Sequence, residues 1–316
     1  MRRSFKVPAP DPNGPVITPT SDVFTAVLWS APKNEPILRN FINAVQINCR
    51  QPTILEATVL NPFSIKEFRE DKQLVLDVHV QDEWSHRYNV EIQTAPHAGF
   101  RDRVLLQWSN VYSGVPRVGD DYTQLVSVKS IVITVFPIFP ALQNLHTIFE
   151  VRARENPEIL LSDHLQMHFL RLGDMLKRRM EGLVDLHIGL QHWMLFFAFG
   201  STTSEKKMST LVQNNPAVMA AYEEFKRFTS DAEMQNVAYR RRRFLEDQRL
   251  YVGAARAEGK AEGKAEGKAE GKAEGKAEGK AERDVEIARN MKQAGSDFGF
   301  IAQMTGLSHS EIERLD

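Results

Sequence analysis

Two acidic side chains interrupt the β-forming stretch of residues 72–93, and their placement suggests chemistry. A hairpin whose turn is centred on Trp84 brings Asp77 opposite Glu91 and leaves the other face of both strands apolar. A slip of one residue would send every side chain to the other face, so a half-buried sheet requires this register. Gln93, two residues beyond Glu91, then lies on the same polar face as the two acids.

Carboxylates that face each other across two strands need a compensating charge, because their Cβ atoms lie ~5 Å apart and like charges there are destabilising. A divalent cation supplies it, since Mg²⁺ typically binds one or two protein carboxylates and keeps its other positions for water and phosphate oxygens. Such an ion lowers the pKa of a bound water and stabilises charge on phosphate, while Gln93 would orient the attacking water or a phosphate oxygen. The alternative is a buried ion pair between the acids and a basic residue such as Arg103.

The elements that hold these acids are predicted from the spacing of apolar residues. Residues 21–44 have helical spacing that Pro32 and Pro36 interrupt, which predicts two helices joined by a turn. Residues 126–136 are continuously apolar and largely β-branched, as expected of a central strand that is buried on both faces. The other expected elements are a strand-like or irregular segment at 54–65, a helix at 101–113, a strand at 165–172 and mostly helix over 173–250.

The acids and the glutamine also form a recognisable motif. Asp77 followed by Glu91-Ile92-Gln93 resembles the PD-(D/E)XK nuclease superfamily, in particular its branch of recombination-promoting nucleases and transposases. The further matches are Ser-Asp-Val-Phe at 21–24, which is similar to the family's Asp-x-x-Phe, Phe-x-x-Arg at 100–103, Gly-x-x-Tyr at 119–122, and a Gly/Glu/Lys repeat followed by TGLSHSEIERL. The resemblance covers the chain from residue 18 onward. It implies an α/β fold whose restriction-endonuclease-like core, a mixed central β-sheet flanked by helices, carries a helical C-terminal extension.

The resemblance implies metal-dependent hydrolysis of phosphodiester bonds in DNA, by an endonuclease associated with recombination or transposition. Its implied cofactor is Mg²⁺ or Mn²⁺, with Asp77 and Glu91 as ligands. Gln93 stands where the superfamily usually has lysine, so positive charge at the phosphate must come from the metal ion or from Arg101 or Arg103. The competing interpretation is a catalytically inactive nuclease fold that serves as a DNA-binding or protein-interaction scaffold.

For two further sets of residues, a functional and a structural explanation are both open. Asp22 is an additional candidate ligand for the metal, and it is equally suited to be the N-cap of the first helix. The densest basic cluster would contact DNA phosphates outside the active site, or it is the solvated face of a helix. This cluster comprises Arg240, Arg241, Arg242 and Arg243.

Histidine and cysteine give no metal site from the sequence alone. His164 and His168 have the ligand spacing of a helix, but the alternation of their neighbours predicts a strand, in which they lie ~13 Å apart. We therefore expect no zinc at this pair. Cys49 is the single cysteine. It suggests a reducing compartment, and it is expected to be a small core residue rather than a nucleophile.

Overall charge and hydropathy narrow the class of protein. The formal net charge of −1 gives no global reason to bind nucleic acid or a membrane surface, so any DNA contact has to be local. No stretch approaches the length of a membrane span, and the first residues lack the apolar core of a signal peptide. We expect a cytoplasmic protein with no membrane partner.

Composition divides the chain into five regions. These are a flexible arm at 1–17, the nuclease-like domain at 18–200, a helical extension at 201–256, a repeat linker at 257–280 and a small helical module at 281–316. The linker is six copies of Ala-Glu-Gly-Lys. Its i,i+4 charge pairs are alike and each glycine costs about 1 kcal/mol relative to alanine, so we expect a solvated spacer that is at best marginally helical.

The last region is expected to hold three short helices in a helix-turn-helix-like arrangement. Gly295 and Gly306 mark the breaks, and Ser308 is suited to cap the last helix. That last helix carries Glu311 and Glu313, and an acidic helix is a poor reader of DNA. The module is therefore expected to make protein contacts or to cap the chain, and a homo-oligomer formed through the C-terminal helices is the corresponding partner.

Overall fold

The computed structural model describes residues 17–62, 77–96, 98–114, 121–173, 175 and 186–315. Most of the expected arm, residues 72–76 of the expected hairpin, and residues 119–120 of the Gly-x-x-Tyr segment lie outside these ranges. Contacts between residues divide the chain into two compact units, residues 1–244 and 245–316.

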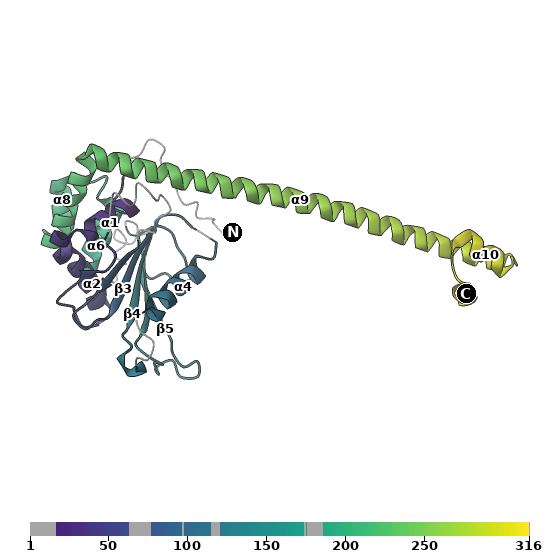
Figure 1. Ribbon diagram of the computed structural model, residues 1–316, viewed down its shortest axis with the longest axis horizontal. Helices are drawn as coiled ribbons and strands as arrows, with labels where there is room; N and C mark the ends of the chain where they lie inside the picture. The colour runs from purple at the N-terminus through teal and green to yellow at the C-terminus, as the bar shows by residue number, and fades with distance from the viewer. Residues whose placement is uncertain are drawn as a thin grey trace. The chain divides into compact units, whose positions relative to one another are not determined.

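The first unit is built on one mixed β-sheet with helices on both faces (Figure 1), as the sequence predicts. The order across the sheet is β1-β2-β3-β4-β6-β5. β3, β4 and β6 run parallel to one another, and the other neighbours pair antiparallel. The strands are β1 Thr58–Val59, β2 Val78–Gln81, β3 Arg87–Gln93, β4 Val128–Thr134, β5 His146–Glu150 and β6 Leu165–Arg171.

The register of the β2–β3 hairpin is the predicted one within the described residues. Val78 pairs with Val90 and Val80 pairs with Tyr88. All four of these side chains are buried in the main core. The register is fixed because only this pairing puts every apolar side chain of the hairpin on the same side of the sheet.

The predicted central strand is also confirmed. β4 pairs with β3 on one side and with β6 on the other, and all seven of its residues are buried. A strand covered on both faces has no solvated side, which explains why its sequence runs apolar and β-branched rather than alternating.

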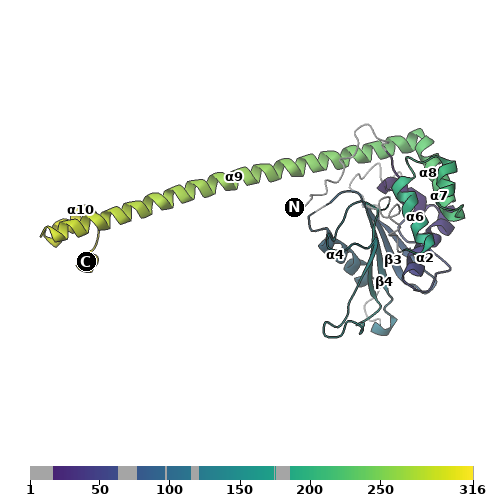
Figure 2. The ribbon, with the colours of Figure 1, turned by 180° about the vertical axis from the view of Figure 1, so that it is seen from behind.

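The helices divide unequally between the two faces of the sheet (Figures 1 and 2). α1, α2, α6 and α8 contribute to the main core on one face, and α4 packs on a smaller cluster over the other. In chain order the helices of this part are α1 Asp22–Ser30, the 3₁₀ turn η1 Pro32–Asn34, α2 Glu35–Asn48, α4 Phe100–Ser113, the 3₁₀ turn η2 Tyr122–Gln124, α6 Ile188–Phe199, α7 Glu205–Leu211 and α8 Pro216–Ser230.

The two helices expected over residues 21–44 are present, with one correction at a cap. Pro36 lies in the first turn of α2, where a missing N–H is no loss because that group has no intrahelical partner. The N-cap of α1 is Ser21, and Asp22 is the first helical residue. The structural explanation offered for Asp22 from the sequence, an N-cap role, is therefore wrong.

Helices beyond residue 200 take part in the core of the first unit. Met208 of α7, Phe225 of α8 and Val237 near the start of α9 (Ala232–Gln293) all lie in the same buried cluster as the sheet. The rings of Phe225 and Phe228 pack in T-shaped contacts with the ring of Phe24 in α1, and their centroids lie 5.0 and 5.4 Å from the Phe24 centroid. Residues 201–244 thus complete the apolar covering of the sheet.

The repeat is helical throughout, which corrects the expectation of a marginal helix. α9 runs without a break through Ala232–Gln293, and the repeat residues 257–280 are all exposed. The costly step of helix formation is nucleation, and adding residues to an existing helix costs much less. Helical segments at both ends of the repeat supply that nucleus, so poor propensity alone does not end the helix.

The second unit ends in the three expected short helices, the first being the end of α9. α10 spans Phe298–Thr305 and α11 spans His309–Glu313. Ala288, Ile301 and Ile312 form their buried centre. Ser308 caps α11 through a reciprocal capping box with Glu311, as its position predicts.

Within the described part of the chain, no helix combines the length and the apolar character needed to span a bilayer.

Candidate active site

The two acids of the hairpin lie on the face of the sheet that α4 covers. Glu91 is in β3, next to Val132 of β4, which packs against Phe100 and Val104 of α4. Asp77 directly precedes β2, and the observed register continued by one residue sets it opposite Glu91. Glu91 is only 4% exposed, so its charge has little help from water.

Two residues of α4, four apart and hence on one side of the helix, bind the acids. Arg103 Nη2 donates to Glu91 Oε1 in a close ion pair. Gln107 Nε2 donates to Asp77 Oδ2 at 2.7 Å. The helix therefore supplies one charged and one neutral partner to the pair of carboxylates.

Gln93 belongs to the same network. Its Oε1 accepts a hydrogen bond of 3.1 Å from Arg103 Nη2, and its Nε2 donates to the carbonyl oxygen of Ala95 at 2.8 Å. Both ends of the amide are thus held, and the guanidinium of Arg103 sits between the glutamine and Glu91.

The electrostatics of the site favour the protonated form of Asp77 and Glu91 when no cation is bound. The pKa of Asp77 is raised to about 7, first by burial and then by the charge of Glu91, while Arg103 opposes the shift and Asp22 adds to it. Burial likewise raises the pKa of Glu91, against the effect of Arg103. The single positive charge of Arg103 therefore does not offset the effect of burial on the pKa values of Asp77 and Glu91.

Asp22 lies near enough to Asp77 to act on its charge, but its own carboxylate is engaged. Asp22 Oδ2 accepts a hydrogen bond of 2.9 Å from Nε of Arg241, and only 11% of the Arg241 side chain is exposed. Of the four consecutive arginines, Arg241 thus joins α9 to α1, while Arg240 and Arg243 are exposed.

Arg101 points to a different part of this face. Its Nη2 donates to the carbonyl oxygen of Ile138 at 2.6 Å, and the guanidinium lies 4.6 Å from the centre of the Phe139 ring. Arg101 is exposed and contacts the loop after β4. Of the two arginines singled out in the Phe-x-x-Arg segment, only Arg103 contacts the acids in these hydrogen bonds and ion pairs.

The residues present fit a hard divalent cation. Glu91 Oε2 and Gln107 Oε1 are buried and have no hydrogen-bond partner in the described structure, as is true of Asn89 Oδ1 and Ser130 Oγ on the same face. A buried polar atom without a partner costs about 1–3 kcal/mol. Unsatisfied oxygens next to two facing carboxylates form the ligand set that Mg²⁺ and Mn²⁺ prefer.

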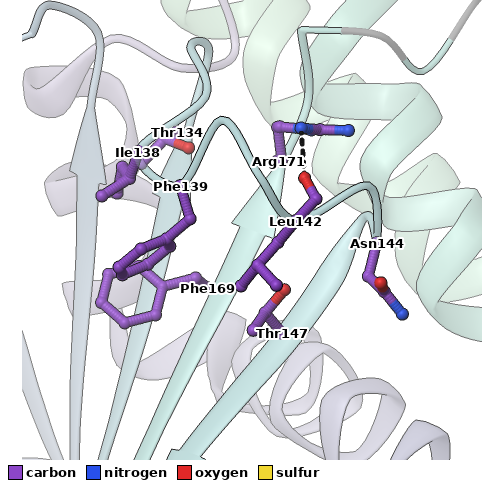
Figure 3. Close-up of a pocket in the computed structure, with 8 residues that line it drawn as sticks. All are labelled: Thr134, Ile138, Phe139, Leu142, Asn144, Thr147, Phe169 and Arg171. Carbon is purple, nitrogen blue, oxygen red and sulfur yellow. Dashed lines mark hydrogen bonds between the residues drawn. The ribbon is translucent and has the colours of Figure 1, made fainter.

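A small cavity lies at the carboxyl ends of β4 and β6 (Figure 3). Its volume is about 20 Å³, which is room for about one water molecule. Thr134, Phe139, Phe169 and Arg171 are among its lining residues, and Arg171 Nη1 donates to the Leu142 carbonyl oxygen at 3.0 Å. The cavity is too small for a nucleotide, and neither Asp77 nor Glu91 is among its lining residues.

A mixed sheet flanked by helices, with paired carboxylates and a neighbouring amide on one face, defines a nuclease-type α/β fold of restriction-endonuclease-like architecture. The family model described as PD-(D/E)XK nuclease family transposase matches residues 19–255, and the chain belongs to this family. No curated protein and no solved structure was found to match. The match ends just before the Ala-Glu-Gly-Lys repeat.

Sequence reasoning did not identify Gln107 as a partner of Asp77, although a signal was present. Phe100, Arg103, Val104 and Gln107 follow i, i+3, i+4 and i+7 spacing, which puts them on one side of a helix. Once Arg103 was placed near the acids, Gln107 followed from that spacing. The partner of Asp22 carried no comparable signal, because Arg241 is 219 residues away in sequence.

Proposed function

We propose that this chain is a DNA endonuclease that hydrolyses phosphodiester bonds with Mg²⁺ or Mn²⁺, in recombination or transposition. Family membership supports a nuclease- or transposase-related role. The observation that carries the finer proposal is the meeting of Asp77 and Glu91 on one face, with Glu91 Oε2 buried and without a partner. Two acids with raised pKa, one of which has a buried oxygen without a partner, are arranged to exchange protons for a metal ion.

In this proposal Asp77 and Glu91 hold the ion through carboxylate oxygens. The bound ion supplies an acidified water and neutralises charge on the scissile phosphate. Gln93, whose amide is held at both ends, orients the water or a phosphate oxygen. Arg103 provides the positive charge that the superfamily's lysine usually supplies, because it is already hydrogen-bonded to Gln93.

Phosphate contacts outside the reacting bond are assigned to exposed arginines. Arg101, Arg240 and Arg243 are exposed and carry charge that DNA binding would use. Asp22 and Arg241 form an ion pair, so we assign Arg241 a role in positioning Asp22 beside the metal ligands. Arg242 remains a candidate for phosphate binding with its neighbours. We also propose a cytoplasmic location, because the single cysteine suggests a reducing compartment.

The competing function is a nuclease fold without catalysis. The ion pair between Arg103 and Glu91 favours it, since a guanidinium already occupies one carboxylate, and Gln93 lacks the usual charge. In that case the protein would bind DNA or a protein partner through the same surfaces and would need no metal.

The test is cleavage of supercoiled plasmid DNA by the full chain with Mg²⁺ or Mn²⁺, compared with Asp77→Asn. We expect metal-dependent nicking by the wild type and a loss of at least 100-fold in the variant, because one ligand of the ion is gone. Asp163→Asn is the matched control, since this acid is 80% exposed and has no role in the proposed reaction. No cleavage by wild type with either metal, or equal cleavage by Asp77→Asn, would show that this site is not catalytic.

A further inference from the structure

A second cluster of potential ligands lies on the opposite face of the sheet from the acids. Cys49 directly follows α2, His146 begins β5 and His168 is in the middle of β6. Within β6, His168 points away from its neighbours Met167 and Phe169, which pack in the smaller core with α4. His168 is buried, and Cys49 and His146 are partly exposed, so the group can be reached from solvent.

The three side chains present their ligand atoms at the spacing of a tetrahedral metal site. Cys49 Sγ lies 3.7 Å from His168 Nδ1 and 3.8 Å from His146 Nε2, and the two nitrogens are 3.1 Å apart. Tetrahedral zinc, with Zn–S of about 2.3 Å and Zn–N of about 2.0 Å, would separate sulfur from nitrogen by about 3.5 Å and the nitrogens by about 3.3 Å. The observed triangle differs from this by a few tenths of an ångström.

We propose that Cys49, His146 and His168 bind a zinc-class divalent ion, with water as the fourth ligand. A thiolate and two imidazoles select a borderline-soft ion such as Zn²⁺ over Mg²⁺, which requires oxygen ligands. This site is therefore chemically distinct from the carboxylate site on the other face. It does not depend on the proposed nuclease activity.

The protonation states are partly prepared for binding. Burial lowers the pKa of His146 to about 4 and that of His168 well below its ordinary range, so both imidazoles are neutral and can donate a lone pair. Burial raises the pKa of Cys49 to about 12, and the thiol donates to the carbonyl oxygen of Val45 at 3.1 Å. Binding releases this one proton to solvent as the thiolate forms, and the nearby charge of Lys129 favours the thiolate while it weakens the attraction for the ion.

The side chain of Asn48 fixes the tautomer of His146. The backbone N–H of His187 donates to Asn48 Oδ1 at 2.7 Å, so the Asn48 amide group donates to His146 Nδ1, also at 2.7 Å. His146 consequently carries its proton on Nε2, pointing toward His168 Nδ1. An ion bound to Nε2 requires that proton to move to Nδ1, where an oxygen at position 48 has to accept it.

This requirement gives a variant that should bind more tightly than the wild type. In Asn48→Asp, one carboxylate oxygen still accepts from the N–H of His187, and the other accepts from protonated His146 Nδ1. Carboxylate partners of metal-binding histidines typically change metal affinity by 10- to 100-fold. We expect Asn48→Asp to bind the ion at least tenfold more tightly, and a purely structural hydrogen-bond network gives no such gain.

The experiment is a titration of the tag-free full chain with Co²⁺, in excess Mg²⁺ so that the carboxylate site is occupied. A thiolate-to-Co²⁺ charge-transfer band should saturate near one equivalent and disappear when Zn²⁺ is added. Cys49→Ser should abolish the band, and His146→Gln should weaken binding at least tenfold. His309→Gln is the control, because this histidine is exposed and lies in the second unit.

The proposal is overturned if the wild type shows no sulfur-based band, or if Cys49→Ser keeps it. Far-UV circular dichroism of each variant separates loss of binding from loss of the fold. If the Ser variant does not fold, Asn48→Asp decides alone, because affinity equal to or below that of the wild type contradicts the tautomer requirement. Failure of plasmid cleavage would leave this result unaffected.

Discussion

Gln93 stands at the position where PD-(D/E)XK nucleases usually carry lysine, and Arg103 supplies a cation that is hydrogen-bonded to it. The guanidinium of Arg103 extends from α4 and donates to both Gln93 and Glu91. The positive charge at this site therefore comes from the helix that covers the strand, not from the strand itself. A planar guanidinium with several donors can keep one hydrogen bond to Gln93 while it turns another toward phosphate. At the scale of single residues, the proposed function depends on how Glu91 is shared between this arginine and a metal ion.

Arg103→Ala tests that sharing. The change leaves the buried carboxylate of Glu91 without its partner, so we expect the free energy of unfolding at pH 7 to fall by about 1–3 kcal/mol without metal. Added Mg²⁺ should then raise the melting temperature of the variant more than that of the wild type, because the ion meets an unpaired carboxylate. Arg101→Ala is the control, since Arg101 contacts the loop after β4 instead. Equal Mg²⁺ stabilisation of all three proteins would contradict the prediction.

The raised pKa of Asp77 predicts that the free energy of unfolding of the metal-free protein depends on pH. Its pKa is about 7 in the fold and near 3.8 in the unfolded chain, so the folded state holds a proton that the unfolded state has lost between these values. The stabilising effect is complete below pH 4 and is lost as the pH rises through 7, at up to about 1.4 kcal/mol per pH unit.

Urea unfolding in the presence of a chelator at pH 5 and pH 7 measures this effect. The wild type should lose more stability between the two values than Asp77→Asn, which has no proton to release. Asp163→Asn, an exposed acid, should behave as the wild type does. The same loss in Asp77→Asn as in the wild type would show that Asp77 keeps an ordinary pKa.

At the scale of elements, α9 shows that context overrides propensity. Six glycines in its repeat lie where an added Cβ would meet nothing within 4 Å, so each costs helix stability without serving a packing role. They occupy positions 259, 263, 267, 271, 275 and 279.

Replacing all six glycines with alanine should stabilise the repeat by roughly 6 kcal/mol in total, at about 1 kcal/mol each. Slower amide hydrogen exchange across residues 257–280 and a higher melting temperature of the far-UV helical signal would show it. Gly306→Ala is the control in which a glycine-to-alanine change should destabilise the protein. Gly306 ends α10 at φ +75°, a conformation that strains alanine. Unchanged exchange in the six-alanine protein would mean that propensity does not limit this helix.

At the scale of the whole molecule, the family match and the main core end in the same part of the chain. The match stops at residue 255, and the last residues of the core cluster are Val237 and Ala238. Everything needed to build the acid site, including the Asp22–Arg241 ion pair, lies before the repeat.

A chain that ends at residue 256 should therefore keep its fold and any metal-dependent cleavage within about twofold. Native mass measured by light scattering on both lengths tests the proposed role of the C-terminal helices in assembly. A fall from oligomer to monomer on truncation supports that role, and the same mass per chain for both proteins removes it. A chain that ends at residue 231 is the matched comparison, because it lacks Arg241 and the core residues of α9 and should be less stable.

The sequence by itself determined most of the elements and the hairpin register, but neither strand β5 nor the unbroken helix through the repeat. Alternation of apolar residues, the two prolines near α2 and the cap at Ser308 act over a few residues, so local patterns suffice to predict them. The facing acids also followed from one register, because only that register separates an apolar face from a polar one.

Only the tertiary structure decided which distant side chains share a site. Asp22 meets Arg241, and Cys49 meets His146 and His168, across separations of 219, 97 and 119 residues. No local pattern encodes such pairs, because they depend on which face of the sheet each helix covers and on where its ends lie. The physical reason is that burial selects a face for each element, while the packing of whole elements selects the partners that meet there.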